Sequence, residues 1–168
     1  MSGVEPRCGT VRVIAIDGPS GSGKSTLADA VAAALGSPVL RVDALFPGWD
    51  GLLEGVRLLR EWVLLPLSQG RRAEYRVWDW AAEDWGGTRV LDPAPWLVVE
   101  GCGSASGAAG TFAALRVWLH APEAVRRQRA LARDGAAYAP HWERWAAQEE
   151  ALFRADDTRR RADLVSRT

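Results

Sequence analysis

The sequence predicts an α/β protein of three layers, in which a five-stranded parallel sheet lies between helices on both faces. Two observations predict this class. Apolar runs of strand length alternate along the chain with helical periodicities, a pattern typical of parallel sheets covered on both sides. A glycine-rich segment, residues 18–26, also joins the first strand directly to the first helix, which is the usual connection of α/β units.

The first half of the chain contains two predicted strands and two predicted helices. Residues 11–16 form a buried apolar run, and residues 24–35 carry apolar side chains at helical spacing. Residues 38–42 form the second strand, and Asp50 is a suitable N-cap for the next helix. Pro66 should kink or end that helix because proline has no amide hydrogen.

The second half begins with an insert, residues 71–95, which is polar and aromatic and is predicted to be irregular or hairpin-like. The elements predicted after it are strand 96–100, strand 116–120, helix 122–133, helix 141–157 and strand 162–165. We place no boundary within 1–168 and expect a single domain. Residues 1–10 are predicted to form a loose tail.

Residues 18–26 match the phosphate-binding pattern G-x-x-x-x-G-K-[ST] in its confirming context of strand, loop and helix. Backbone N–H groups of such a loop turn inward on phosphate oxygens, and the helix N-terminus adds its positive end. The lysine reaches the β- and γ-phosphates, and the following hydroxyl can hold Mg²⁺. This lysine is the only one in the chain. The residues expected to hold the nucleotide phosphates are Gly18, Ser20, Gly21, Ser22, Gly23, Lys24, Ser25 and Thr26.

The composition excludes several other classes. The 168 residues carry no formal net charge, so a nucleic-acid-binding surface is not expected, because such domains are usually basic. Cys8 and Cys102 form neither a metal-binding spacing nor a disulfide framework, which favours a reducing cytoplasm. Residues 1–10 contain no signal-peptide core, and no apolar run approaches the ~20 residues of a membrane span. We therefore expect a cytoplasmic protein, and the sequence assigns it no oligomeric state.

Acidic residues follow two other predicted strands, Asp43 after the second and Glu100 after the third. The carboxyl ends of parallel strands meet at one edge, where ligands gather. A carboxylate there can accept the proton of a hydroxyl acceptor, whereas an anionic phosphate acceptor needs arginines instead. A cation is a natural partner for Glu100, since a carboxylate ending an apolar strand is costly alone. The alternatives are that Asp43 ties down its loop and that Glu100 is an ordinary solvated acid.

Three segments together resemble the uridine kinase family of small P-loop kinases over residues 11–135. They are the phosphate loop, Val98-Val99-Glu100-Gly101 and Asp43-Ala44-Leu45-Phe46. Residues 43–52 and 138–145 are also similar to bacterial proteins described only as ATP-binding or uridine kinase-like. The resemblance implies a P-loop kinase fold, with ATP and Mg²⁺ as cofactors. It also implies that Asp43 is the base and that Ser25 and Glu100 serve the metal.

The same resemblance places a lid after the fourth predicted strand. Its arginines would neutralise charge on the transferred phosphoryl group: Arg126 at the nucleotide, Arg129 and Arg133 in catalysis together with Lys24. The alternative is a solvated helix face. The tip of this lid, residues 134–140, contains no arginine, which departs from the family pattern, and Arg144 is a candidate substitute.

In the insert, the family carries a Tyr-Asp pair and a His that hold the nucleoside, and no His follows here. The candidate acceptor-binding residues are Asp43, Trp49, Tyr75, Arg76, Asp79, Trp80 and Glu100. The alternative is that the tryptophans form a small second core. A later stripe at core spacing is interpreted as packing, and its members are Trp142, Trp145, Glu149 and Leu152.

These observations lead to one preferred hypothesis and two alternatives. The preferred one is ATP- and Mg²⁺-dependent transfer of a phosphoryl group to a hydroxyl of a small, nucleoside-like molecule. The first alternative is a nucleoside monophosphate kinase, in which an acceptor phosphate is cradled by Arg41, Arg71, Arg72 or Arg76. The second is an ATP-binding module that is non-catalytic or weakly hydrolytic. The single lysine excludes the Asn-Lys-x-Asp guanine motif of GTPases.

Overall fold

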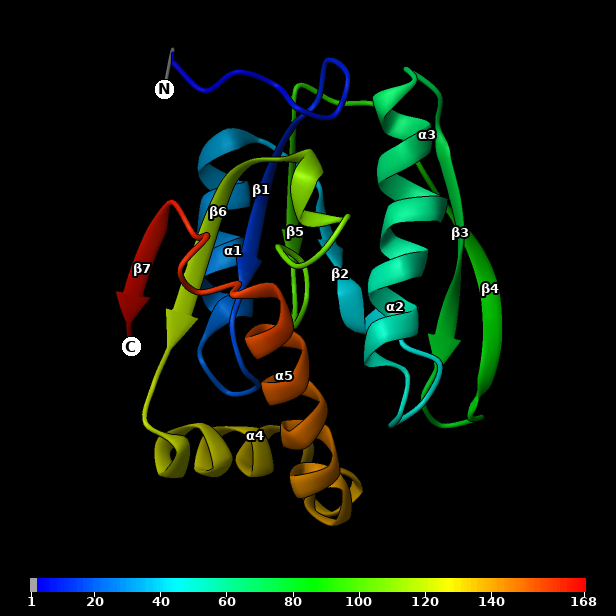
Figure 1. Ribbon diagram of the computed structural model, residues 1–168. Coiled ribbons are helices and arrows are strands. Elements are labelled where there is room, and N and C mark those ends of the chain that lie inside the picture. The colour runs from blue at the N-terminus through cyan, green and yellow to red at the C-terminus, as the bar shows by residue number, and fades with distance from the viewer. Residues whose placement is uncertain (1–2) are drawn as a thin grey trace.

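The computed structural model describes residues 3–168 and contains the predicted three-layer architecture (Figure 1). A five-stranded sheet has the order β2-β5-β1-β6-β7, with every neighbouring pair parallel. The strands are β1 (Arg12–Asp17), β2 (Val39–Arg41), β5 (Trp96–Glu100), β6 (Ala113–His120) and β7 (Leu164–Arg167). The predicted fold class is therefore confirmed. The fourth strand begins earlier than predicted, and the last is displaced by two residues to pair with β6.

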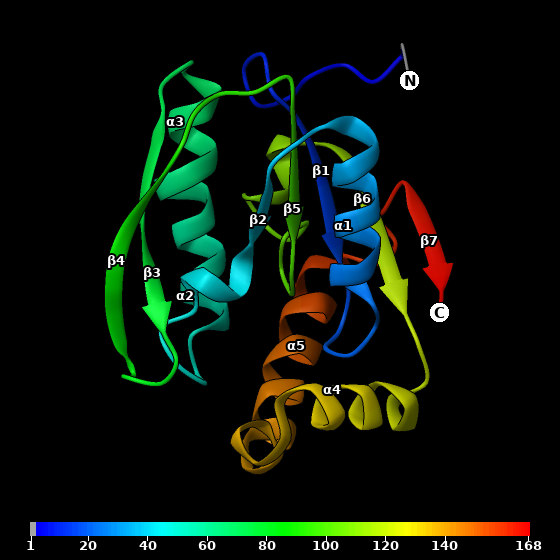
Figure 2. The same cartoon turned by 180° about the vertical axis from the view of Figure 1, so that it is seen from behind.

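Helices cover both faces because side chains along each strand alternate between them. Ile14 and Val98 lie in an apolar cluster with helix α1 (Lys24–Leu35) on one face (Figure 2). Their strand neighbours Val13 and Val99 belong to the larger cluster on the opposite face. This alternation is why central strands of a covered sheet are apolar throughout, as the sequence pattern predicted.

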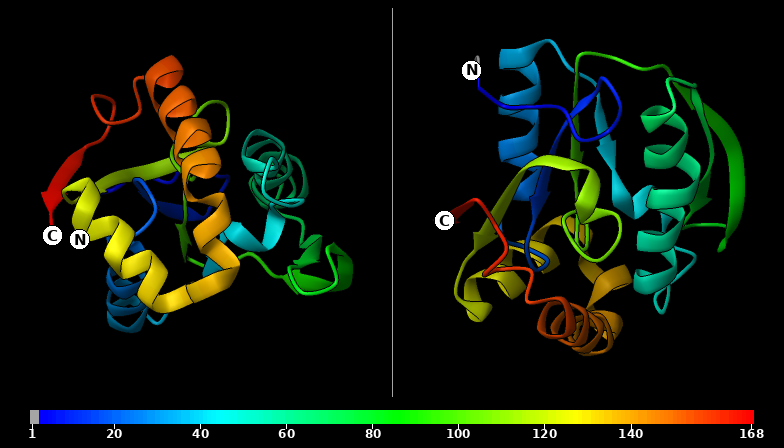
Figure 3. Two further views of the ribbon diagram at one scale, coloured as in Figure 1. Left: turned by 90° about the horizontal axis from the view of Figure 1, so that it is seen from below. Right: turned by 45° about the horizontal axis from the view of Figure 1, so that its top comes forward.

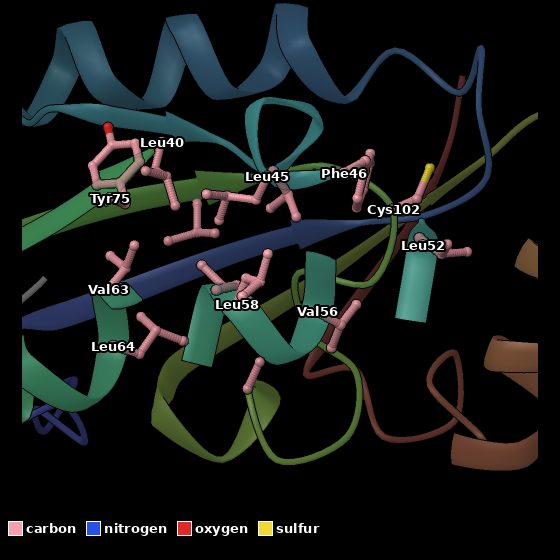
Figure 4. Close-up of a cluster of buried hydrophobic side chains, with 14 of the residues drawn as sticks. Leu40, Leu45, Phe46, Leu52, Val56, Leu58, Val63, Leu64, Tyr75 and Cys102 are labelled. Carbon is pink, nitrogen blue, oxygen red and sulfur yellow. The ribbon is translucent and has the colours of Figure 1, made fainter. Parts of the chain in front are cut away.

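The larger cluster is formed with a long helical segment (Figure 4). This segment consists of α2 (Leu52–Leu58), the π-helical stretch η2 (Leu59–Leu64) and α3 (Leu65–Ser68). Pro66 was predicted to kink or end this segment; it lies in the first turn of α3, and the segment ends two residues later, at Ser68. The π-helical stretch was not predicted from the sequence. It directly precedes the turn that contains Pro66, which has no N–H group and cannot donate a helical hydrogen bond.

The insert forms an antiparallel hairpin of β3 (Ala73–Asp79) and β4 (Asp84–Leu91). Figure 1 shows the hairpin on the outer side of α2 and α3, separate from the main sheet. Trp62 of the helical segment packs against Trp85 of the hairpin, with ring centroids 5.3 Å apart. The hairpin-like prediction for this region is thus confirmed.

Helices α4 (Glu123–Tyr138) and α5 (Trp142–Asp156) follow β6 and are joined by the short turn η4 (Ala139–His141). Seen from below, they cross the end of the sheet at which the strands finish (Figure 3). Gly135 interrupts α4 with φ 57° and ψ −135°, so the predicted break is a kink, after which the helix resumes. None of the helices in residues 3–168 is both long and apolar enough to cross a bilayer.

Candidate active site

The phosphate loop leaves β1 in a conformation that requires glycine. Gly18 and Gly21 have φ values of 139° and 78°. A Cβ atom on Gly18 would lie 2.1 Å from the carbonyl oxygen of Leu119, and one on Gly21 would lie 2.2 Å from that of Arg126. The loop therefore lies directly against the backbone of β6 and α4, at the carboxyl ends of the strands.

Asp17 anchors this loop from beneath. Its fully buried carboxylate accepts N–H groups from Gly18 at 2.7 Å and from Gly103 and Ala105 at 2.9 Å each. Burial raises the pKa of Asp17 to about 6, although the three N–H groups and Lys24 oppose the shift. These contacts tie the phosphate loop to the loop after β5.

Lys24 is buried, and its Nζ donates to the carbonyl oxygen of Pro19 at 3.0 Å. Burial by itself would lower the pKa of this ammonium group. The negatively charged groups around it, which include Glu149 and Glu100, outweigh burial and raise its pKa. The site therefore holds Lys24 as a cation, which is the form that binds phosphate.

Glu100 is buried and paired, unlike the solvated acid considered above. Its Oε1 accepts the Ser25 hydroxyl at 3.1 Å and an Arg41 guanidinium N–H at 2.8 Å. Arg41 also donates to Asp29 at 2.7 Å. A hydroxyl and a carboxylate are hard oxygen ligands of the kind Mg²⁺ prefers, so they fit this ion. Residues 3–168 contain no cluster of three His, Cys, Asp or Glu side chains suited to a metal, so phosphate oxygens and water would complete its shell.

Asp43 lies in the short helix η1 (Val42–Leu45), which follows β2. Asp43 is solvent-exposed and lines the neighbouring pocket. Partial loss of hydration at the pocket wall and the nearby Glu100 raise the pKa of Asp43, whereas the Ala44 N–H, Arg41 and Arg133 oppose this shift.

A pocket of about 1060 Å³ brings the phosphate loop, η1, the hairpin tip, α4 and α5 together. The predicted site residues on its wall are Ser20, Gly21, Gly23, Lys24, Ser25, Thr26, Asp43, Trp49, Trp80, Glu100, Arg129 and Arg133. This volume is at the upper end of the range for small-molecule sites, which suits two ligands that must meet.

Three predicted acceptor-binding residues of the hairpin lie away from that wall. Tyr75 is buried in the large core cluster beneath the hairpin. Arg76 donates to the carbonyl oxygen of Trp85 at 2.9 Å. Asp79 accepts the N–H of Ala81 at 2.9 Å and thereby closes the turn. Strand alternation and turn geometry direct these side chains elsewhere, and Trp80 is the predicted hairpin residue that reaches the pocket.

The arginines of α4 have different environments. Arg126 donates to carbonyl oxygens of Ala121 at 3.1 Å and Ser20 at 3.2 Å, so it supports the loop from outside the pocket. Arg129 donates to the Thr168 hydroxyl at 2.9 Å. Arg133 pairs with its neighbour Asp134 at 2.6 Å. Gly18 and Ser22 also lie off the pocket wall, and Arg144, the candidate substitute, pairs with Asp50.

Aromatic side chains line one end of the pocket, which we call the aromatic end. Trp49 stacks on Tyr138 and on His141, with centroids 5.3 Å and 4.4 Å apart. Trp80 lies 4.8 Å from Trp49. Trp145 completes this wall. Tyr138 and His141 were in a segment singled out by resemblance, but no site role was predicted for either.

Glu149 is the functional candidate that the sequence pattern concealed, because its position in a core stripe suggested packing. Its carboxylate is 3% exposed. Oε1 accepts the Ser20 N–H at 2.9 Å, the Ser20 hydroxyl at 2.6 Å and the Trp145 indole N–H at 2.8 Å. A carboxylate within an otherwise apolar buried stripe was the available signal, since a buried charge requires partners.

Two solved structures with a similar fold are described as kinases. A possible uridine kinase from Bacillus stearothermophilus has a TM-score of 0.67 and 21% identity, over 92% of this chain and 87% of that one. Shikimate kinase from Bacteroides thetaiotaomicron has a TM-score of 0.53 and 17% identity, over 93% and 86% of the two chains. The family model for cytidylate kinase matches residues 14–48, which contain the phosphate loop. A comparison with curated proteins found no match. The chain therefore has the fold of the small P-loop kinases.

Proposed function

We propose that this protein is an ATP-dependent kinase that phosphorylates a hydroxyl group of a small, nucleoside-like molecule. One observation carries the proposal: the phosphate loop with Lys24 and the carboxylate of Asp43 open into the same pocket. A phosphate site alone would support binding, whereas a carboxylate beside it supports transfer to a hydroxyl.

Each group would then have a defined role. Lys24 and the loop N–H groups hold the phosphates of ATP, and Ser25 and Glu100 would hold Mg²⁺. When bound, the ion neutralises phosphate charge. Asp43 accepts the proton of the acceptor hydroxyl as the hydroxyl oxygen forms a bond to the γ-phosphorus of ATP, and the bond from this phosphorus to the bridging oxygen breaks to release ADP. Arg129 and Arg133 face the pocket from α4, where they would stabilise the transferred charge.

The pairing of the arginines supports a hydroxyl acceptor over a nucleoside monophosphate. Arg41 is engaged by both Glu100 and Asp29. The three other arginines considered for an acceptor phosphate lie outside the pocket wall: Arg71, Arg72 and Arg76. A phosphate at the acceptor end would therefore lack the cradle that this chemistry needs.

The residual charge of the pocket also favours a neutral or cationic acceptor. Lys24 and Arg129, at the phosphate end, form no salt bridge within the described chain. Asp43 and Glu83 lie toward the aromatic end, and neither has a basic partner within 4.0 Å among residues 3–168. These carboxylates would repel an anionic acceptor and accept hydroxyl or amine donors, while the aromatic walls suit a flat ring.

The test is an ADP-release assay over neutral nucleosides, amino sugars, neutral sugars, sugar acids and nucleoside monophosphates. We expect acceptor-stimulated release with a neutral or cationic hydroxyl compound, and loss of about 100-fold or more in turnover for Asp43→Asn. Asp79→Asn is the matched control, because Asp79 lies off the pocket wall. Near-normal turnover of Asp43→Asn would refute the base assignment. Release that no acceptor stimulates would favour the weakly hydrolytic ATP-binding module.

A further inference from the structure

A buried carboxylate on α5 holds the phosphate loop from behind. Oε1 of Glu149 accepts both the backbone N–H and the hydroxyl of Ser20, at 2.9 Å and 2.6 Å. Ser20 itself lines the pocket, whereas Glu149 does not. The carboxylate therefore contacts the loop without lining the pocket itself.

The same oxygen accepts two further donors. They are the indole N–H of Trp145 at 2.8 Å and the thiol of Cys102 at 2.9 Å. A buried carboxylate is costly unless it is well partnered, and several donors on one oxygen provide this compensation. An apolar residue at this position would be sufficient for packing, so the carboxylate indicates a role in hydrogen bonding to these donors.

This network joins the two ends of the pocket. The indole ring of Trp145 lines the aromatic end and lies 5.0 Å from the ring of Phe46. Its N–H meets Glu149, which in turn meets the phosphate loop at Ser20. One side chain thus connects the wall of the acceptor end with the loop that holds the phosphates, and it belongs to the helix that directly follows the lid tip.

We propose that Glu149 is a positioning residue of the phosphate loop. It holds Ser20 in place from α5, so the affinity for ATP depends on the position of this helix. The inference rests on the proposed nucleotide-binding role of the loop. Glu149 is not assigned to the chemical step, because it lies off the pocket wall.

Helix α5 provides a matched pair of variants. Trp145 and Trp142 are both buried on this helix. The indole N–H of Trp145 binds Glu149, whereas that of Trp142 has no partner within the described part of the chain. Trp145→Phe and Trp142→Phe remove the same atoms from two buried positions of one helix, but only the former removes a donor to Glu149.

The experiment measures the Kd of ATP with Mg²⁺ by calorimetry, together with the melting temperature of each nucleotide-free variant. We expect Kd to rise about tenfold or more in Glu149→Ala and about threefold in both Glu149→Gln and Trp145→Phe, because charge-assisted bonds to the loop are lost or weakened. Glu149→Gln should be intermediate, since its amide oxygen still accepts a bond. Trp142→Phe should remain within about twofold of the wild type.

A purely structural role would lower the melting temperature and leave Kd unchanged. Unchanged Kd in Glu149→Ala, or equal effects of the two tryptophan variants, would overturn the proposal. If Glu149→Ala does not fold, Glu149→Gln and Trp145→Phe decide the question. If the wild type binds ATP but phosphorylates no acceptor, the proposed kinase function fails, while the comparison of Kd values still tests Glu149.

Discussion

The indole ring of Trp49 lies against the phenol ring of Tyr138, with centroids 5.3 Å apart and planes only 16° from parallel. Trp49 follows η1, near the proposed base, whereas Tyr138 ends α4 beyond the kink at Gly135. His141 stacks on the same indole at 4.4 Å. The proposed lid tip therefore contacts Trp49 through Tyr138, and this stack lines the aromatic end of the pocket.

Replacing Trp49 with alanine should loosen the lid. Each aromatic pair contributes about 0.5–1.5 kcal/mol beyond simple burial, and Trp49 stacks on Tyr138 of the proposed lid tip and on His141, which directly follows it. We expect faster hydrogen exchange in residues 134–141 of Trp49→Ala than in the wild type. Trp62→Ala is the control of equal size, because Trp62 packs against Trp85 on the hairpin side. Equal exchange in all three proteins would show that the stack does not hold the lid.

Lys24 should be protected from amine-reactive reagents by ATP. Because it is the only lysine in the chain, mass spectrometry can follow its side-chain modification without interference from other lysines. The raised pKa of Lys24 leaves little neutral amine near pH 8, so modification should be slow there and accelerate toward pH 10. ATP with Mg²⁺ should reduce labelling, and adenosine, which has no phosphate, should not. Protection by both ligands to the same degree would contradict phosphate binding at this lysine.

The acidic limb of the pH–rate profile should report Asp43. A base acts in its deprotonated form, and the pKa of Asp43 lies above the ordinary value of an aspartate. Turnover should therefore fall as pH decreases through that raised pKa. Arg133 opposes the shift, so Arg133→Gln should move this limb to higher pH and lower turnover about tenfold or more. Arg127→Gln, an exposed change on the same helix, serves as control, and an unmoved limb in Arg133→Gln would argue against their interaction.

Asp17 should make stability depend on pH. Its folded-state pKa of about 6 lies above the value near 3.9 expected in the unfolded chain. The folded state therefore binds the proton more tightly, and the associated stabilisation is complete below about pH 4 and lost as pH rises through about 6.

Asp17→Asn removes this titration. It also replaces one hydrogen-bond-accepting oxygen with an NH₂ donor, which should lower the free energy of unfolding by about 1–3 kcal/mol. We expect the difference in free energy of unfolding between the wild type and Asp17→Asn to shrink between pH 4.5 and 7. Urea denaturation at the two pH values measures this difference. A difference that does not change with pH would refute the shifted pKa.

Local pattern was sufficient for much of the scaffold. The apolar run of β5 and the helical spacing of α1 were both predicted to within a residue, because periodic burial leaves a direct trace in sequence. The hairpin was predicted as an insert, but its pocket-facing residues were not separated from its core residues. Tyr75 and Trp80 are equally aromatic, and the pairing register and turn geometry decided that Tyr75 is buried in the core while Trp80 reaches the pocket.

The sequence by itself determined the phosphate loop, the order of the strands and helices along the chain, and the two carboxylates at or just after the ends of the second and third predicted strands. These features depend on residues close together in the chain. Only the tertiary structure decided which distant residues are in contact: Arg41 binds Glu100, Trp49 stacks on Tyr138, and Glu149 binds Ser20 across 129 positions of sequence. Helical periodicity shows that a side chain is buried, but the partner that compensates a buried charge is chosen by packing between distant segments.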